Sequence, residues 1–347
     1  MMKGRERINA AMRREQPDRA PVWCQLSLEH IIRNTFPDGE YPRLIDDFVH
    51  AECDLTRRYD FDGMIVYLPG VREGTRIDEF LKEWIHAVPH GDPSHDFAAV
   101  DPETLEQEIP EYESVDFYSS RLAREILGPD YHIGGWTPDA FSRAVQWFPT
   151  MEEALMSMAL EPERFKTLIA FYEPQCTAWA LAQIRIGNLE SIHISSPYAG
   201  SSFISLDTYN NLVLPQLIRL ANILKPEPAF SYVHTCGFLS DRLELIASSG
   251  VDGIECMDPP PLGNVVLSEA KRRIGGNVFL KGNLDSVNTL LYGTDDVVDR
   301  AIMECLEAGM PGGGYILSTA CSVAPAVPPE RVQRLAILAE KHGYYEL

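Results

Sequence analysis

The chain has 347 residues, of which 45% are hydrophobic and 23% charged, a globular composition with room for one large domain or two smaller ones. Its net charge of −21 is offset by no local cluster of lysine and arginine, so we expect neither nucleic acid nor a membrane surface as partner. The charged start, residues 1–7, and the absence of eighteen consecutive apolar residues predict a cytoplasmic protein. Seven scattered cysteines, an odd number, argue against a disulfide framework.

The first half of the chain mixes strands with helical segments. Apolar residues at helical spacing predict helices over residues 4–14, 28–34, 42–59 and 151–187. Aromatic and β-branched runs bounded by turn residues predict strands over residues 21–26, 63–68 and 131–136. The acidic segment 101–113 is expected to be a surface excursion.

The second half alternates apolar runs with amphipathic segments, which is typical of β/α units around a parallel sheet. Strands are expected over residues 191–195, 229–234, 253–257, 278–282 and 314–319, and helices over 206–224, 239–249, 264–274, 294–308 and 329–342. The total of eight units predicts an α/β fold, a (β/α)8 barrel with an N-terminal helical extension, as one domain over residues 1–347. An open doubly wound sheet is disfavoured because no Gly-x-Gly-x-x-Gly follows a strand.

Three ligand-type side chains stand at predicted strand ends. His234 and Cys236 share a face because side chains alternate along a strand, and Cys321 closes a later strand. In a barrel, the carboxyl ends of all strands meet at one mouth, so Cys321 can join the other two. Three protein ligands with an open fourth position are usual for catalytic zinc. The alternative is a chance pairing of buried core residues.

Further polar residues follow the neighbouring strands. Glu255 can be a fourth, displaceable ligand or a catalytic group, or simply a carboxylate that caps a loop. Cys256 is expected on the opposite face, as packing. Asn283 and Asp285 can contact substrate or orient a zinc-bound histidine, and can equally be turn residues.

Aromatic residues after two strands suggest a substrate surface. Trp136, Tyr198 and Phe203 are expected near the mouth, where they can contact an aromatic or corrinoid face, and the alternative is ordinary loop or core packing. His193 is expected to be a packed strand histidine with a satisfied internal bond.

Residues 13–23, 234–237, 281–285 and 313–316 make nearly the whole chain resemble the uroporphyrinogen decarboxylase superfamily. That resemblance implies a β/α barrel from either the decarboxylase branch or a branch of zinc-dependent methyltransferases that work with methylcorrinoid proteins. The second branch carries His-x-Cys and a distant Cys as zinc ligands, here His234, Cys236 and Cys321. The three-ligand set also resembles that of cobalamin-independent methionine synthase, whose zinc adds a glutamate, as Glu255 can here.

Departures from the decarboxylase pattern favour the methyltransferase branch. The decarboxylase holds a substrate with eight carboxylates through an arginine-containing segment, where this chain has residues 25–30 without arginine. The resemblance therefore implies a zinc enzyme that moves a methyl group between a corrinoid on a partner protein and a small molecule, either a thiol acceptor or a methylated donor such as a methyl ether. Uroporphyrinogen decarboxylation is the alternative activity, and a non-catalytic subunit stabilised by zinc is a third hypothesis.

Overall fold

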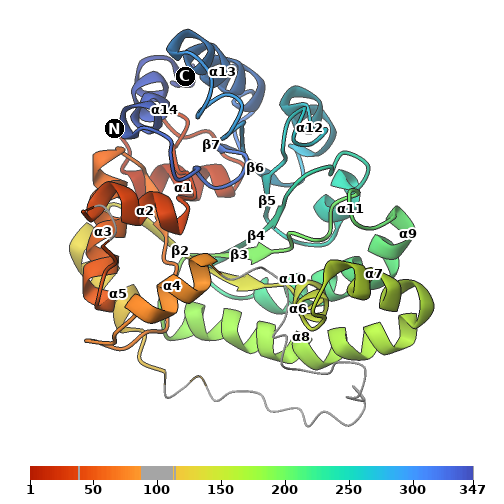
Figure 1. Ribbon diagram of the computed structural model, residues 1–347. Helices are drawn as coiled ribbons and strands as arrows, with labels where there is room; N and C mark the ends of the chain where they lie inside the picture. The colour runs from red at the N-terminus through yellow and green to blue at the C-terminus, as the bar shows by residue number, and fades with distance from the viewer. Residues whose placement is uncertain (38–39, 87–111, 113–114, 347) are drawn as a thin grey trace.

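The computed structural model describes residues 1–37, 40–86, 112 and 115–346, and shows a curled sheet with helices around its outer side (Figure 1). All neighbouring strands are parallel, and their order in the sheet follows the sequence. The seven strands are β1 (Gly63–Ile65), β2 (His132–Pro138), β3 (Ser191–Ser195), β4 (Phe230–Thr235), β5 (Gly253–Cys256), β6 (Phe279–Leu284) and β7 (Tyr315–Thr319).

The helices are α1 (Gly4–Met12), α2 (Leu28–Thr35), α3 (Ile45–Arg58), α4 (Asp78–His86), α5 (Tyr118–Leu127), α6 (Ala140–Gln146), α7 (Met151–Leu160), α8 (Pro162–Arg185), α9 (Leu206–Thr208), the π-helical turn η3 (Tyr209–Val213), α10 (Leu214–Leu224), α11 (Leu243–Ser248), α12 (Leu267–Ile274), α13 (Asp295–Gly309) and α14 (Pro329–His342). The helical region expected over residues 151–187 is two helices, because Pro162 starts a new one after Glu161. Within the described residues, no helix is long and apolar enough to cross a membrane. The predicted excursion over residues 101–113 lies outside the described residues except for Tyr112.

The eighth strand expected over residues 21–26 is not formed as a regular strand, so the prediction of eight strands is corrected to seven. This segment makes isolated parallel bridges, Val22 with Leu317 and Leu26 with Val323. Its hydrogen-bond ladder is interrupted because Pro21 has no N–H and the Val22 N–H donates to the carboxylate of Asp62 at 2.8 Å. The Asp62 N–H, next to β1, donates to the Val22 carbonyl at 2.8 Å. The segment thus contacts both edges of the sheet.

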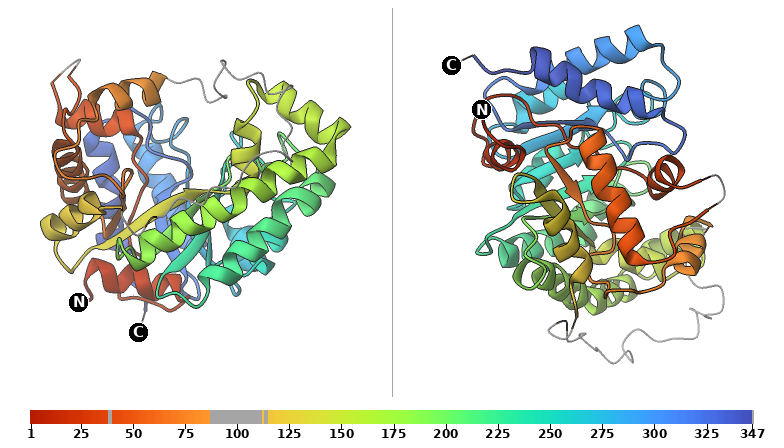
Figure 2. Two further views of the ribbon diagram at one scale, coloured as in Figure 1. Left: turned by 90° about the horizontal axis from the view of Figure 1, so that it is seen from below. Right: turned by 90° about the vertical axis from the view of Figure 1, so that its left-hand side faces the viewer.

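Helix α1 covers the end of the sheet interior opposite the strand carboxyl ends. Its residues Ile8, Ala11 and Met12 are buried in one apolar cluster with Trp23, Tyr232 and other interior side chains. The larger apolar core lies between the sheet and the outer helices. Both termini lie at the same side of the molecule (Figure 2), where the Ala20 N–H donates to the Gly343 carbonyl at 2.8 Å. Helix α1 and the side chains packed on it form the floor of the sheet interior, and a functional site can lie at the opposite end, where the strands have their carboxyl ends.

Candidate metal centre

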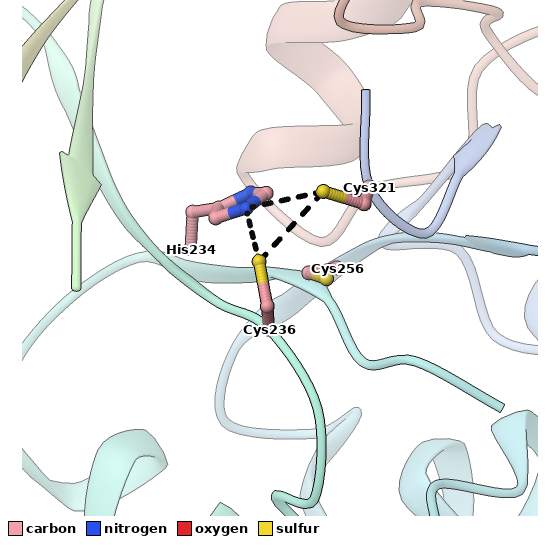
Figure 3. A group of neighbouring side chains, drawn as sticks. All are labelled: His234, Cys236, Cys256 and Cys321. Carbon is pink, nitrogen blue, oxygen red and sulfur yellow. Dashed lines mark hydrogen bonds between the residues drawn. The ribbon is translucent and has the colours of Figure 1, made fainter. Parts of the chain in front are cut away.

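Three side chains from two distant segments converge where β4 and β7 end. His234 is the penultimate residue of β4, Cys236 directly follows that strand, and Cys321 lies two residues beyond β7. Figure 3 shows the imidazole of His234 and the two sulfur atoms pointing toward one another. The 85 residues that separate the two cysteines are therefore spanned by the β/α succession, as expected for strand ends at one mouth.

The distances among the three donor atoms match those of a single tetrahedral ion. His234 Nε2 lies 3.2 Å from Cys236 Sγ and 4.0 Å from Cys321 Sγ, and the two sulfur atoms are 3.7 Å apart. Zinc–sulfur bonds of about 2.3 Å and zinc–nitrogen bonds of about 2.0 Å at a tetrahedral angle place two sulfurs about 3.8 Å apart and a sulfur and a nitrogen about 3.6 Å apart. The residues present therefore fit a zinc ion.

Glu255 binds the far side of the imidazole. Its Oε2 is 3.2 Å from His234 Nδ1, whereas His234 Nε2 faces the cysteines. A carboxylate that accepts from Nδ1–H fixes the tautomer in which Nε2 is free to bind a metal. In this geometry Glu255 orients the histidine, and its predicted role as a fourth ligand or catalytic group stays a prediction.

Glu255 is also the centre of a buried charged group beneath the mouth. Lys281 on β6 donates to Glu255 Oε1, and His193 Nδ1 lies 3.1 Å from Oε2, outside hydrogen-bond geometry. Burial opposes ionisation of Glu255, but the Lys281 ammonium and the hydrogen bond with His234 outweigh it and hold the pKa of this carboxyl well below its usual range. Burial lowers the pKa of His193 to about 3, so this ring is neutral. The Lys281 ammonium lies 4.4 Å from the ring centroid of Trp23.

The surroundings of Cys321 favour the thiolate form of its side chain. Hydrogen bonds with Cys236 and Cys256, together with the nearby His234, lower its pKa well below the ordinary value, although burial acts in the opposite direction. Both Cys236 and Cys321 are only partly buried, so the two sulfur atoms stand at the entrance of the site. A thiolate is the form of cysteine that binds zinc.

Cys256 lies in the same cluster, contrary to the expectation that it packs on the opposite face. Its backbone φ is 78° and that of Met257 is 54°, so two successive non-glycine residues are left-handed and the regular alternation of the strand ends there. The Cys256 sulfur lies within 4.8 Å of the donor atoms of His234, Cys236 and Cys321. Figure 3 shows it beside Cys236.

The polar atoms of Asn283 and Asp285 are engaged in local structure. Asn283 Nδ2 donates to the carbonyls of Met257 at 2.8 Å and Val265 at 3.2 Å. Asp285 Oδ1 accepts from the N–H groups of Val287 and Asn288, each at 2.8 Å. These bonds stabilise the loops after β5 and β6, and the predicted contacts with substrate stay predictions.

The structure has an aromatic cavity of about 640 Å³. Its lining includes Ser195, the β3 neighbour of His234 in the sheet. Trp136 lines it and donates its indole N–H to the Tyr67 carbonyl at 2.9 Å. Tyr67, Phe80 and Trp179 add further aromatic surface. Among the described residues, Tyr198 is not part of this lining and instead packs edge-on against Phe203, with ring centroids 6.1 Å apart. The cavity is large enough for a small organic substrate.

The sequence profile of the uroporphyrinogen decarboxylase (URO-D) family matches residues 3–342. The chain belongs to this family. It is 25% identical over 226 residues to the "Methylcobamide:CoM methyltransferase MtaA" of Methanosarcina barkeri, an alignment that covers 65% of this chain and 62% of that protein. It is also 24% identical over 345 residues to the uroporphyrinogen decarboxylase of Alkalilimnicola ehrlichii, covering 94% of this chain and 90% of that protein.

A solved "methyltransferase from Methanosarcina mazei" has a similar fold, with a TM-score of 0.77 over 98% of this chain and 99% of that chain. The two sequences are 18% identical, so the likeness concerns the fold alone. The chain spans about three fifths of the length of the MtaA methyltransferases that it matches, 62%. Methyltransferases and decarboxylases are thus both among its relatives.

Sequence reasoning missed the buried partners of Glu255. Lys281 directly follows the apolar run of residues 278–280 within the predicted strand. A lysine at such a place in a buried strand indicates a charge that needs a partner. His193 faces the same interior as His234, and their rings stack with centroids 4.8 Å apart. Period-two alternation along β3 predicts this inward direction, but it does not predict the contact with Glu255.

Proposed function

We propose that this chain is a zinc-dependent methyltransferase that moves a methyl group between a small substrate and a corrinoid bound to a partner protein. The observation that carries the proposal is the convergence of His234 Nε2, Cys236 Sγ and Cys321 Sγ within 3.2–4.0 Å of one another. Membership of the URO-D family and the similarity to methylcobamide:CoM methyltransferases support the same activity.

The donor set suits zinc, since two soft thiolates and a borderline imidazole prefer this metal over magnesium or calcium. Zinc at this position supplies Lewis acidity, which lowers the pKa of a substrate thiol or polarises the leaving atom of a methylated donor. The protein contributes the orientation of the imidazole through Glu255, and the lowered pKa of Cys321 favours the thiolate form of this ligand. The aromatic cavity lined by Trp136 and Tyr67 offers an apolar surface to a small substrate.

The corrinoid partner approaches from the mouth. Cys236 and Cys321 are partly exposed there, and His193, Glu255 and Lys281 close the interior below them. We therefore expect a bulky planar group to reach the site from the strand carboxyl ends. The same geometry serves a thiol that accepts a methyl group and a methyl ether or other donor that gives one up.

Uroporphyrinogen decarboxylation remains the alternative because the decarboxylase relatives align over more than nine tenths of this chain. The cavity argues against it. Among the described residues that line the cavity, Arg143 is the one cation, whereas a substrate with eight carboxylates requires several. The segment of residues 25–30 offers no arginine, and its His30 is buried against Tyr59.

We further infer that residues 1–347 form one domain whose sheet closes into a barrel through the segment of residues 21–26. Support comes from the backbone hydrogen bonds that this segment makes at both edges: Asp62 N–H to the Val22 carbonyl, and Trp23 N–H to the Leu317 carbonyl at 3.1 Å. The strand order, which runs without interruption from β1 to β7, also favours a single folding unit.

The test measures zinc and methyl transfer in the same preparations. We expect about one zinc per chain and methyl transfer between methylcobalamin and a thiol, both lost in Cys321→Ala and kept in the matched control Cys305→Ala, whose buried thiol lies outside the cluster. Decarboxylation of uroporphyrinogen by zinc-free protein would reject the proposal. If removal of zinc only unfolds a protein that never transfers methyl groups, the zinc is structural.

A further inference from the structure

The fourth cysteine of the cluster carries an inference beyond the three-ligand site. Cys256 is fully buried, and its sulfur lies within 4.8 Å of all three proposed donor atoms. The proposed function uses His234, Cys236 and Cys321 and leaves Cys256 without a role.

The backbone at Cys256 brings its sulfur beside the cluster of His234, Cys236 and Cys321. Left-handed φ values at Cys256 and Met257 are unfavourable for residues other than glycine. Simple core packing does not require this conformation, because the regular alternation of β5 would place a cysteine in the apolar layer outside the sheet. The strained turn instead brings a soft donor to the cluster.

Asp258 connects this turn to the loop that carries Cys236. Its Oδ2 accepts a hydrogen bond from the Gly237 N–H at 2.6 Å and from the Cys256 thiol at 3.3 Å. One carboxylate therefore fixes the two cysteine-bearing segments relative to each other. It is also the group next to Cys256 that can take the thiol proton when the sulfur turns away.

We propose that Cys256 is the fourth metal ligand of the resting protein, which then holds zinc through one imidazole and three thiolates. This inference rests on the metal site of the proposed function. Sulfurs on one tetrahedral ion are about 3.8 Å apart, so Cys256 Sγ has to approach by about 1 Å at most, within reach of a side-chain rotation. On ligation the Cys256 proton passes to the Asp258 carboxylate, and no electron is gained or lost.

Of the four donors, Cys256 is the most easily replaced. It alone is shared with a competing hydrogen-bond acceptor, Asp258, to which its thiol can return. The resting centre is thus closed with four protein ligands, and an incoming substrate ligand takes the position that Cys256 leaves.

The test counts thiolates on the metal in cobalt-substituted protein, because near-ultraviolet sulfur-to-cobalt charge-transfer intensity increases with the number of thiolate ligands. We expect Cys256→Ser and Cys321→Ser each to remove about one third of the intensity, and Cys305→Ser, a buried cysteine elsewhere, to remove none. Serine keeps the hydrogen bond to Asp258 and loses the soft ligand. We also expect the Kd for zinc to rise at least about tenfold in Cys256→Ser.

Different outcomes separate this inference from the proposed function. If Cys256→Ser keeps full intensity and Cys321→Ser loses about half, the centre has two thiolates and the inference is wrong while the metal site stands. If the wild-type protein binds neither cobalt nor zinc, both fail. Cadmium NMR of the wild-type protein counts the thiolate ligands without any variant, so the test does not depend on the folding of Cys256→Ser. A chemical shift typical of two thiolate ligands would overturn the inference.

Discussion

Lys281→Met tests whether the buried charged group beneath the mouth is held by one ion pair. Lys281 and Glu255 are 1% exposed, and no solvent screens the pair. Two unit charges about 4 Å apart attract by about 4 kcal/mol at an effective dielectric constant of 20. Methionine keeps the apolar stem of the lysine but leaves the Glu255 carboxylate buried without its cation.

We expect Lys281→Met to lower the free energy of unfolding by about 3–5 kcal/mol, as is typical when one partner of a buried pair is removed. Loss of the contact between the ammonium and Trp23, 4.4 Å from the ring centroid, contributes to this decrease. The measurement is urea unfolding of metal-free protein at pH 7, followed by circular dichroism.

Lys166→Met is the matched control, since Lys166 makes an ion pair of 2.8 Å with Glu163 and both side chains are exposed. We expect a change below about 0.5 kcal/mol there. In the double variant with Glu255→Gln, part of the loss at Lys281 is recovered because no buried charge remains unpaired. A loss below about 1 kcal/mol in Lys281→Met would show that Glu255 is neutralised in another way and would refute the reasoning.

Three further predictions concern buried ionisable groups. Burial lowers the pKa of His30 to about 4 and that of His132 to about 3. Just below pH 6.5 these histidines therefore bind protons in the unfolded state and stay neutral in the folded state. Burial also lowers the pKa of His193 to about 3, so the three histidines together lower stability by up to about 4 kcal/mol per pH unit between pH 6 and 4. His30→Gln removes about one third of this contribution in unfolding experiments, and equal slopes would contradict it. Burial raises the pKa of Glu52 to about 8, so wild-type stability declines relative to Glu52→Gln as pH rises from 5 to 8, by up to about 1.4 kcal/mol per unit; parallel pH profiles would contradict this. Glu255→Gln weakens the bond that orients His234, and chelator competition should show a 10–100-fold loss of zinc affinity at unchanged stoichiometry; unchanged affinity would remove the orienting role.

The sequence predicted the parts of the fold that depend on periodicity. Alternation along the strand placed His234 and Cys236 on one face, and the β/α succession brought Cys321 to the same edge of the sheet. The seven regular strands and most helices follow the apolar patterns. The segment of residues 21–26 was predicted as a strand because its apolar pattern does not reveal that Asp62 takes the Val22 N–H.

The site beyond the three proposed ligands depends on contacts that no local pattern encodes. Cys256 reaches the cluster through two left-handed residues, a conformation that the identities of Cys256 and Met257 do not predict. The pairing of Glu255 with Lys281 requires the register of β5 against β6, in which these two residues are neighbours. Within a regular strand the sequence gives the face of each side chain, and the register between strands decides which charges meet.

The interior links the floor of the sheet to the proposed metal centre through a continuous set of contacts. Trp23 packs with helix α1 and lies beneath the Lys281 ammonium. Lys281 donates a hydrogen bond to Glu255, and Glu255 is hydrogen-bonded to His234 Nδ1. Because Lys281, Glu255 and His234 are buried, none of these three can change rotamer without leaving a charge or a polar atom unpaired. The position of the His234 imidazole is therefore fixed from below, and the freedom to exchange ligands is confined to the cysteines above it.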